Sequence, residues 1–141
     1  MSAVIRFYHE VKAYRTAFAL QQRIYALSRS WPREEAFSLT VRVLRSSRAI
    51  GAELAHAWAR RPEPAEFMTR LCMVDAEVAE TLHWLETAHG CGYLKDEHYR
   101  SLREECHSLG RMLTAMARAC QRVAAATEVD APLPRQVGDL L

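Results

Sequence analysis

The feature that most constrains the fold is the spacing of apolar residues in the last third of the chain. Between residues 102 and 123, apolar positions recur at alternating steps of four and three without a break: Leu102, Cys106, Leu109, Leu113, Met116, Cys120 and Val123. Residues at this spacing share one face of an α-helix. An unbroken seam of this kind is typical of helix bundles and coiled coils. The sequence therefore predicts a long helix with one face packed against other helices.

Three earlier segments repeat this spacing, and each is bounded by residues that favour helix ends. The first covers residues 8–29. The second starts at Trp31-Pro32, since proline suits a first helical turn, and stops before Pro62-Glu63-Pro64. The third ends at Gly90-Cys91-Gly92, because glycine tolerates the left-handed conformation of a C-terminal cap. Their predicted core positions are Ala13, Ala17, Leu20, Ile24 and Leu27; Leu39, Val43, Ser46, Ile50, Leu54 and Trp58; and Phe67, Leu71, Val74, Val78, Leu82 and Leu85.

Short turns join these four segments, and none of them has the alternating pattern of a strand. We therefore predict an all-α fold, an up-down-up-down four-helix bundle. A chain of 141 residues forms one ordinary hydrophobic core without the help of a disulfide or metal. We assign residues 1–126 to a single bundle domain, and residues 127–141, which contain Pro132 and Pro134, to a flexible C-terminal tail.

We expect no signal for export or membrane insertion. The first ten residues carry a charge at Arg6 and have no apolar core of the length that a signal peptide needs. No run approaches the roughly 18 consecutive apolar residues of a transmembrane helix. The cysteines form no C-x-x-C pair, so we expect free thiols in a reducing compartment. The expected location is cytoplasmic, with no membrane partner.

A helix bundle raises the question of a di-metal site, because di-iron bundles use two Glu-x-x-His motifs. Two such strings are present, Glu53-Leu-Ala-His56 and Glu80-Thr-Leu-His83. If the second and third helices form an antiparallel hairpin, residue 53 lies opposite residue 71. At about 1.5 Å per residue the motifs are then roughly 16 Å apart, against about 3.5–4 Å for a metal pair. Since no catalytic triad order, nucleophile elbow or glycine-rich phosphate loop occurs either, we expect no metal, no cofactor and no enzymatic activity.

The charge is uneven along the chain although the formal net charge is only +2. Residues 1–70 contain twelve Lys or Arg against six Asp or Glu, and the remainder contains seven against eleven. All the cations except Lys12 and Lys95 are arginine, the side chain best suited to bidentate phosphate contact. On the predicted helices, several of these arginines recur at steps of three, four or seven and so form stripes along a helix face. Such stripes can follow a phosphate backbone, but a charged outer face also simply keeps a bundle soluble. The predicted nucleic-acid-binding residues are Lys12, Arg15, Arg23, Arg42, Arg45, Arg48, Arg60, Arg61, Arg111, Arg118 and Arg122.

Part of the second segment resembles the four-helix bundle family of ribosomal-RNA intervening-sequence proteins. That family shows an aromatic-Pro-x-x-Glu string, then Leu-x-x-Gln-x-x-Arg and Ser-Ile-x-x-Asn-Ile-Ala-Glu-Gly. The resemblance extends over about residues 7 to 120 and is weakest in the most polar part of the signature, at Arg42, Ala49, Glu53, His56 and Ala57. The matching positions are Trp31, Pro32, Glu35, Leu39, Arg45, Ile50, Leu54 and Ala55, then Phe67, Leu71, Glu80 and Leu85, and then Gly92-Tyr93-Leu94.

The resemblance implies a non-enzymatic bundle that assembles into a ring-shaped homo-oligomer, a pentamer. Relatives include the accessory variability protein of diversity-generating retroelements, which binds nucleic acid and a reverse transcriptase. On this basis we expect an accessory protein that binds RNA or DNA through arginine-rich faces and meets a reverse transcriptase or another protein encoded nearby. The alternative is a protein-protein interaction scaffold with no nucleic-acid role.

Overall fold

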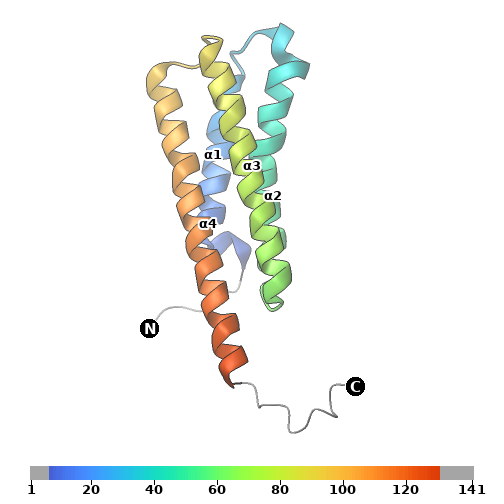
Figure 1. The fold of residues 1–141 in the computed structure, drawn as a ribbon. Helices are drawn as coiled ribbons and strands as arrows, with labels where there is room; N and C mark the ends of the chain where they lie inside the picture. The colour runs from blue at the N-terminus through green and yellow to red at the C-terminus, as the bar shows by residue number, and fades with distance from the viewer. Residues whose placement is uncertain (1–6, 131–141) are drawn as a thin grey trace.

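The computed structural model describes residues 7–130, and within that range it contains helices and no strand. Four long helices lie side by side: α1 (Lys12–Ser28), α2 (Val41–Ala59), α3 (Pro64–Gly90) and α4 (Asp96–Asp130) (Figure 1). α1 packs against α2 and α4, and α3 packs against the same two helices. The α1–α2 edge of the bundle is therefore opposite the α3–α4 edge, which faces the viewer in Figure 1. The predicted all-α class with four helices is confirmed.

The first two helices begin later than the sequence predicts. Tyr8–Glu10 forms a short 3₁₀ helix, η1, and the extended backbone of Val11 (φ −72°, ψ 126°) separates it from α1. Before α2, Arg33–Glu35 forms a 3₁₀ turn (η2) and Ala36–Thr40 a π-helical turn (η3). Trp31, which precedes these turns, and Leu39, which lies within η3, are both buried. The chain between α1 and α2 is thus anchored in the core by two side chains, while its backbone passes from a 3₁₀ turn to a π-helical turn.

The third and fourth helices follow the prediction closely. α3 ends at Gly90, and Gly92, at φ 81°, is the glycine in the left-handed conformation. Its backbone N–H donates to the carbonyl of His89, and the next N–H, of Tyr93, donates to the carbonyl of Ala88. Two carbonyls at the end of α3 are thereby satisfied, as in other left-handed helix caps. α4 includes residues 127–130; the remainder of the expected tail, 131–141, lies outside the described residues.

The hydrophobic core contains the predicted apolar faces of all four helices. Every predicted core position is buried or half-buried except Val123, which is 66% exposed. The Cys120 Sγ atom is 3.8 Å from the carbonyl oxygen of Pro64, the first residue of α3. Residue 123 is therefore about one helical turn beyond the level at which α3 begins. The C-terminal part of α4 projects beyond α3 in Figure 1. The spacing predicts which face of α4 is apolar but not where its neighbours stop.

Two contacts between α2 and α3 fix the register of that pair. Arg70 Nη1 is 3.7 Å from Glu53 Oε2, one residue away from the predicted pairing of positions 53 and 71. Further along, the hydroxyl oxygens of Ser46 and Thr81 are 2.9 Å apart in the core. These contacts place the two Glu-x-x-His strings at different levels of the bundle.

The remaining sequence expectations concern the cysteines and membranes. Cys72, Cys91, Cys106 and Cys120 are all free thiols, as predicted. Burial, followed by the nearby charge of Glu105, raises the pKa of Cys106 to about 12. None of the helices within residues 7–130 combines the length and apolar character that crossing a membrane requires.

Candidate nucleic-acid interface

The structure divides the predicted cationic residues among four surfaces. Those of α1 lie toward α4, those of α2 form the outer face of that helix, two lie at the α2–α3 turn, and those of α4 lie on its exposed side, where Arg111 and Arg118 reach the groove with α3. The sequence places α1 and α2 together as one basic half, but the fold turns most of their cations in different directions. The four groups are Lys12, Arg15 and Arg23; Arg42, Arg45 and Arg48; Arg60 with Arg61; and Arg111, Arg118 and Arg122.

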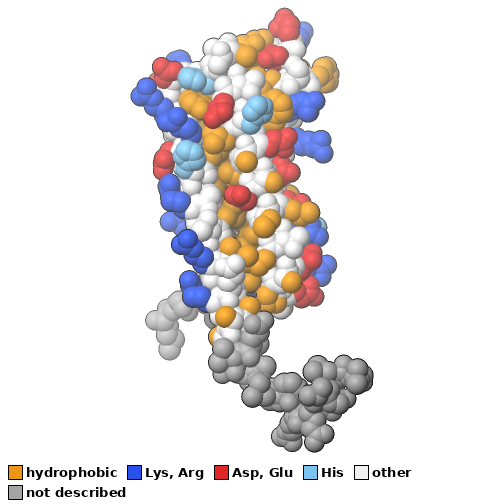
Figure 2. All heavy atoms as spheres, viewed as in Figure 1, with side chains coloured by type: hydrophobic (Ala, Val, Ile, Leu, Met, Phe, Trp, Pro, Cys, Tyr) orange, Lys and Arg blue, Asp and Glu red, His pale blue; other side chains and the backbone are white. Residues whose placement is uncertain are grey.

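A row of cations follows the exposed edge of α4. Figure 2 shows this row as blue side chains along the left edge of the molecule, where α4 runs. Its members from Arg100 to Arg122 extend over about 33 Å at 1.5 Å per residue. One acid interrupts the row, because Arg111 Nη2 donates to Glu104 Oε1 at 2.8 Å, and this bond lowers the pKa of Glu104. Both partners are well exposed, so their ion pair contributes little to stability.

The cations of α1 differ in whether other side chains already bind them. Lys12 and Arg15 are exposed and border a hollow of about 380 Å³ between α1 and α4 that also includes Glu105. Arg23 is instead held between the helices: its Nη1 donates to Ser101 Oγ at 2.7 Å and is 3.8 Å from Glu105 Oε1. Arg23 therefore connects α1 to α4, and its place in the predicted binding set is the least supported by its contacts.

The three arginines of α2 have three different neighbours. The guanidinium of Arg42 is 5.6 Å from the ring centre of Trp84 on α3, and that of Arg48 is 5.6 Å from the ring centre of Tyr25 on α1. Arg45 is near Glu77 of α3. Burial, then the adjacent Glu80, raises the pKa of Glu77, and the positive charge of Arg45 opposes that rise. The positive charge of Arg42, Arg45 and Arg48 is therefore partly neutralised by acids on the α3 side of α2. The α1 side of α2, which carries Arg48, has no such acid among its described contacts.

One arginine on this α1 side, Arg29, is absent from the residues predicted to bind nucleic acid. Arg29, at the C-terminal cap of α1, lies 5.8 Å from the ring centre of Tyr25, the same ring that Arg48 approaches. Tyr25 and Arg29 are four residues apart, a spacing that brings them to one helix face and is visible in the sequence. The approach of Arg48 depends on how α1 and α2 pack, which the sequence does not display.

At the α2–α3 turn an aromatic and an arginine form a compact pair. The guanidinium of Arg61 lies 4.4 Å from the ring centre of Trp58 and donates to the Trp58 carbonyl at 2.9 Å. Beside this pair is an apolar hollow of about 290 Å³ whose walls include Phe67, Met116 and Val123. Arg60 is exposed in the turn. This end of the bundle is more apolar than the sequence prediction implied.

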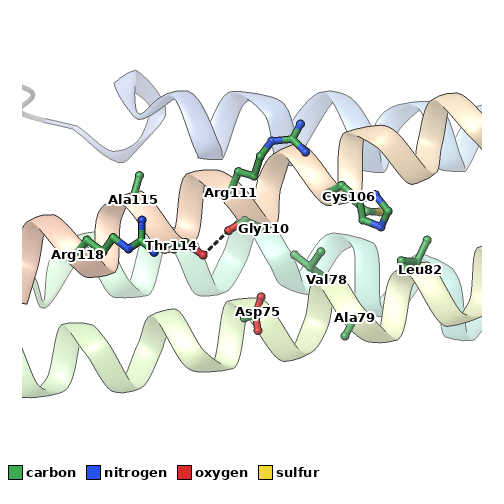
Figure 3. A pocket seen from close by; sticks show the side chains of 11 residues that line it. Asp75, Val78, Ala79, Leu82, Cys106, Gly110, Arg111, Thr114, Ala115 and Arg118 are labelled. Atoms are coloured by element: carbon green, nitrogen blue, oxygen red, sulfur yellow. Dashed lines mark hydrogen bonds between the residues drawn. The ribbon is translucent and has the colours of Figure 1, made fainter.

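A longer apolar groove separates α3 from α4. Its largest hollow has a volume of about 650 Å³, and Figure 3 shows Asp75 and Val78 pointing from α3 toward α4. The remaining walls are mostly small or apolar side chains, and the α4 side also carries His107, Arg111 and Arg118. The Thr114 hydroxyl donates to the Gly110 carbonyl at 3.0 Å and so is satisfied within its own helix (Figure 3). In Figure 2 apolar side chains cover this groove over most of its length.

The two Glu-x-x-His strings make other contacts. Glu53 is paired with Arg70, and Glu80 Oε1 accepts a hydrogen bond from Trp84 Nε1 at 3.4 Å. His56 and His83 are both exposed. Among the side chains that the structure describes, no three His, Cys, Asp or Glu residues are grouped as metal ligands would be.

Comparisons with known proteins point to one family. A family model described as 23S rRNA-intervening sequence protein matches residues 9–115. Among solved structures, a protein of the S23 ribosomal protein family from Bacteroides thetaiotaomicron, described as having unknown function, is similar with a TM-score of 0.68 at 24% sequence identity. The similarity covers 75% of this chain and 95% of that one, and at this identity it shows the shared fold. No curated protein matches the sequence.

Proposed function

The chain belongs to the 23S rRNA-intervening sequence protein family, and from this premise we propose that it is a non-enzymatic, cytoplasmic accessory protein that binds RNA or DNA. In this proposal the up-down-up-down bundle assembles into a ring-shaped homo-oligomer, a pentamer, whose arginine-rich faces contact nucleic acid. The ring serves a larger nucleoprotein complex, such as one that contains a reverse transcriptase.

One observation carries the nucleic-acid proposal: three exposed arginines on α2 and α4 form no ion pair with the described side chains. Arg48, Arg118 and Arg122 have no carboxylate within ion-pair distance among the described side chains, in contrast to Arg23, Arg70 and Arg111. An arginine without such a partner is available to a phosphate, and binding it releases condensed counterions. A ring repeats each arginine row once per subunit, so the local potential rises although each chain has a net charge of only +2.

Two unlike apolar surfaces support the ring. The α3–α4 groove is lined mainly by small and apolar side chains, with Asp75, Arg111 and Arg118 beside them. On the opposite edge of the bundle, Tyr8, Tyr14 and Phe18 form a ladder of rings with centres 4.8 and 6.3 Å apart, and Tyr8 and Phe18 are exposed. A contact between two different faces of the same chain is heterologous, and repeated contacts of this kind form a ring when the rotation between subunits closes. We therefore place the aromatic ladder of one subunit in the α3–α4 groove of the next.

The first test measures binding to generic RNA and DNA over a range of salt concentrations. The variant replaces Arg42, Arg45 and Arg48 by Gln; the matched control carries Ala65→Glu, Thr69→Glu and Ala76→Glu on exposed positions of α3, which lower the net charge equally. We expect the first variant to lose affinity and to reduce the slope of log K against log salt by about 1 for each phosphate contact removed. No affinity of the wild type at low salt, or equal losses in both variants, would contradict the proposal.

The second test concerns the ring. Ala79→Glu places a charge in the α3–α4 groove, whereas Ala26→Glu makes the same change at an exposed position of α1 outside it. Light scattering coupled to size-exclusion chromatography should show subunits dissociating in the first variant only. A monomeric wild type would reject the ring.

The apolar groove also favours a second candidate, a protein-protein interaction scaffold. In that case the groove accommodates an amphipathic helix of a different protein, in the way that such helices lie in hydrophobic grooves elsewhere. A monomeric wild type that binds no nucleic acid at low salt would favour the scaffold over the ring.

A further inference from the structure

We propose that Tyr25, Arg29 and Arg48 form a binding site for an unpaired nucleotide of single-stranded RNA or DNA. The base stacks on the Tyr25 ring while the two guanidinium groups bind the flanking phosphates. This inference rests on the proposed function and narrows it, because it names the form of nucleic acid that this face of the bundle selects.

The geometry brings two cations to one exposed aromatic ring. Arg29 and Arg48 come from different helices, and their guanidinium carbons lie 5.8 and 5.6 Å from the centre of the same ring. Tyr25 itself is 41% exposed. An exposed ring next to arginines is the combination with which single-strand-binding proteins stack bases and follow the backbone.

The charge of this site is not compensated locally. Neither Arg29 nor Arg48 has a carboxylate within ion-pair distance among the described side chains. Both side chains are long and exposed, so each can turn from the ring toward a phosphate when a base occupies the ring face. The contact with Tyr25 holds the two guanidinium groups close to the position that they would take in the complex.

The other arginine–aromatic pairs of the described chain lack one of these features. Trp84 and Trp58 are half-buried, and each is approached by one arginine. Tyr99 is approached by Arg103, but its ring is already stacked on His89, with ring centres 4.3 Å apart. Tyr25 is therefore the ring in this group that combines exposure with two guanidinium groups.

The site requires a base that is free to leave its stack. In a duplex the faces of the bases are covered by their neighbours, whereas loops and single strands present them to aromatic side chains. Tyr25 should therefore contribute to the binding of single strands and very little to the binding of duplexes, for which the arginines alone supply contacts.

The experiment compares three variants of the full chain by fluorescence anisotropy, with a 12-nucleotide oligouridine and a 12-base-pair RNA duplex as probes. Tyr25→Leu removes the ring, and Tyr25→Phe keeps it. Phe37→Leu removes a ring that is 90% exposed in the segment between α1 and α2 and that none of the described arginine–aromatic pairs includes. We expect Tyr25→Leu to weaken oligouridine binding about 5- to 150-fold and to leave duplex binding unchanged. Tyr25→Phe and Phe37→Leu should bind both probes like the wild type, and circular dichroism checks that all variants are folded.

The outcomes separate this inference from the proposed function. If Tyr25→Leu binds oligouridine like the wild type, or loses duplex affinity equally, the site is rejected while the arginine-mediated binding remains. A loss in Phe37→Leu as large as that in Tyr25→Leu would also reject it, because exposure alone would then explain the effect. If the wild type binds neither probe at low salt, both proposals fail.

Discussion

The hydroxyl pair between Ser46 and Thr81 allows the packing of α2 against α3 to be tested independently of function. Thr81 is fully buried, Ser46 is 1% exposed, and their oxygens are 2.9 Å apart. Their second contacts differ: the Thr81 hydroxyl is 2.8 Å from the Glu77 carbonyl, whereas the Ser46 hydroxyl is 3.4 Å from the Val43 carbonyl. Without its partner, the Thr81 hydroxyl keeps a short hydrogen bond, whereas the Ser46 hydroxyl keeps only a long one.

This asymmetry predicts unequal costs for the two single substitutions. Thr81→Val leaves the Ser46 hydroxyl buried with only its long contact to Val43, so we expect a loss of about 1–3 kcal/mol in the free energy of unfolding. Ser46→Ala leaves Thr81 with its short bond to Glu77 and should cost about 0.5–1.5 kcal/mol. In the double variant both partners are apolar, so its cost should be smaller than the sum by about 1 kcal/mol.

Urea denaturation at one fixed protein concentration measures all these values, since the stability of an oligomer depends on concentration. Ser47 supplies the control, because it is buried beside Ser46 but donates to the Leu44 carbonyl of its own helix at 3.2 Å. Ser47→Ala combined with Thr81→Val should be additive within about 0.5 kcal/mol. If the Ser46 and Thr81 substitutions are also additive, or if Ser46→Ala costs more than Thr81→Val, the inferred contact between α2 and α3 is wrong.

Three further predictions follow from single residues. Because burial raises the pKa of Cys106 to about 12, the native protein should show no reaction of Cys106 with a disulfide reagent at pH 8, while exposed Cys72 and Cys91 react; mass spectrometry identifies the labelled thiols. The hydrogen bond from His89, followed by the charge of His89, lowers the pKa of Asp96 from 3.8. The stability that Asp96 contributes to the fold is therefore present above pH 3.8 and is lost as the pH falls through the lowered pKa. NMR titration of the His89→Gln variant should show the pKa of Asp96 returning toward 3.8. Gly51 is buried in α2, but an added Cβ would lie 3.5 Å from Tyr14 Cε2, an ordinary contact, so Gly51→Ala should raise the unfolding free energy by up to about 1 kcal/mol in thermal or urea denaturation.

The sequence predicts the helices and their apolar faces well because each helix reports its buried face at three- and four-residue spacing. The sequence is less informative where the burial or hydrogen bonding of a side chain depends on a neighbouring helix. Val123 continues the apolar seam of α4, yet it is largely exposed because α3 begins at Pro64, whose level on α4 is already reached at Cys120. Thr81 and Ser47 are buried although their polar character argues against it, since hydrogen bonds satisfy their hydroxyls.

The candidate site shows the same division between local and distant information. Lys12, Arg15 and Arg23 lie on one arc of a helix, and the sequence gives no reason to separate them. Arg23 differs because its guanidinium donates a hydrogen bond to Ser101, 78 residues away, and forms an ion pair with Glu105. Arg29 is four residues from Tyr25, but its importance emerges only when Arg48 of α2 approaches the same ring. Contacts within one helix were thus accessible from the sequence, and contacts between helices were not.

The distribution of acidic partners explains how a chain with a net charge of +2 can present surfaces for a polyanion. Glu53, Glu77 and Glu80 lie along α2 and α3, where they meet Arg45 and Arg70. At physiological ionic strength charges more than about 8 Å apart in water are largely screened from each other. The acids of the α2–α3 side therefore weaken the potential near Arg45 far more than the potential beside Tyr25 or along the outer edge of α4. A phosphate that approaches those two surfaces responds to the nearby arginines rather than to the charge of the whole chain.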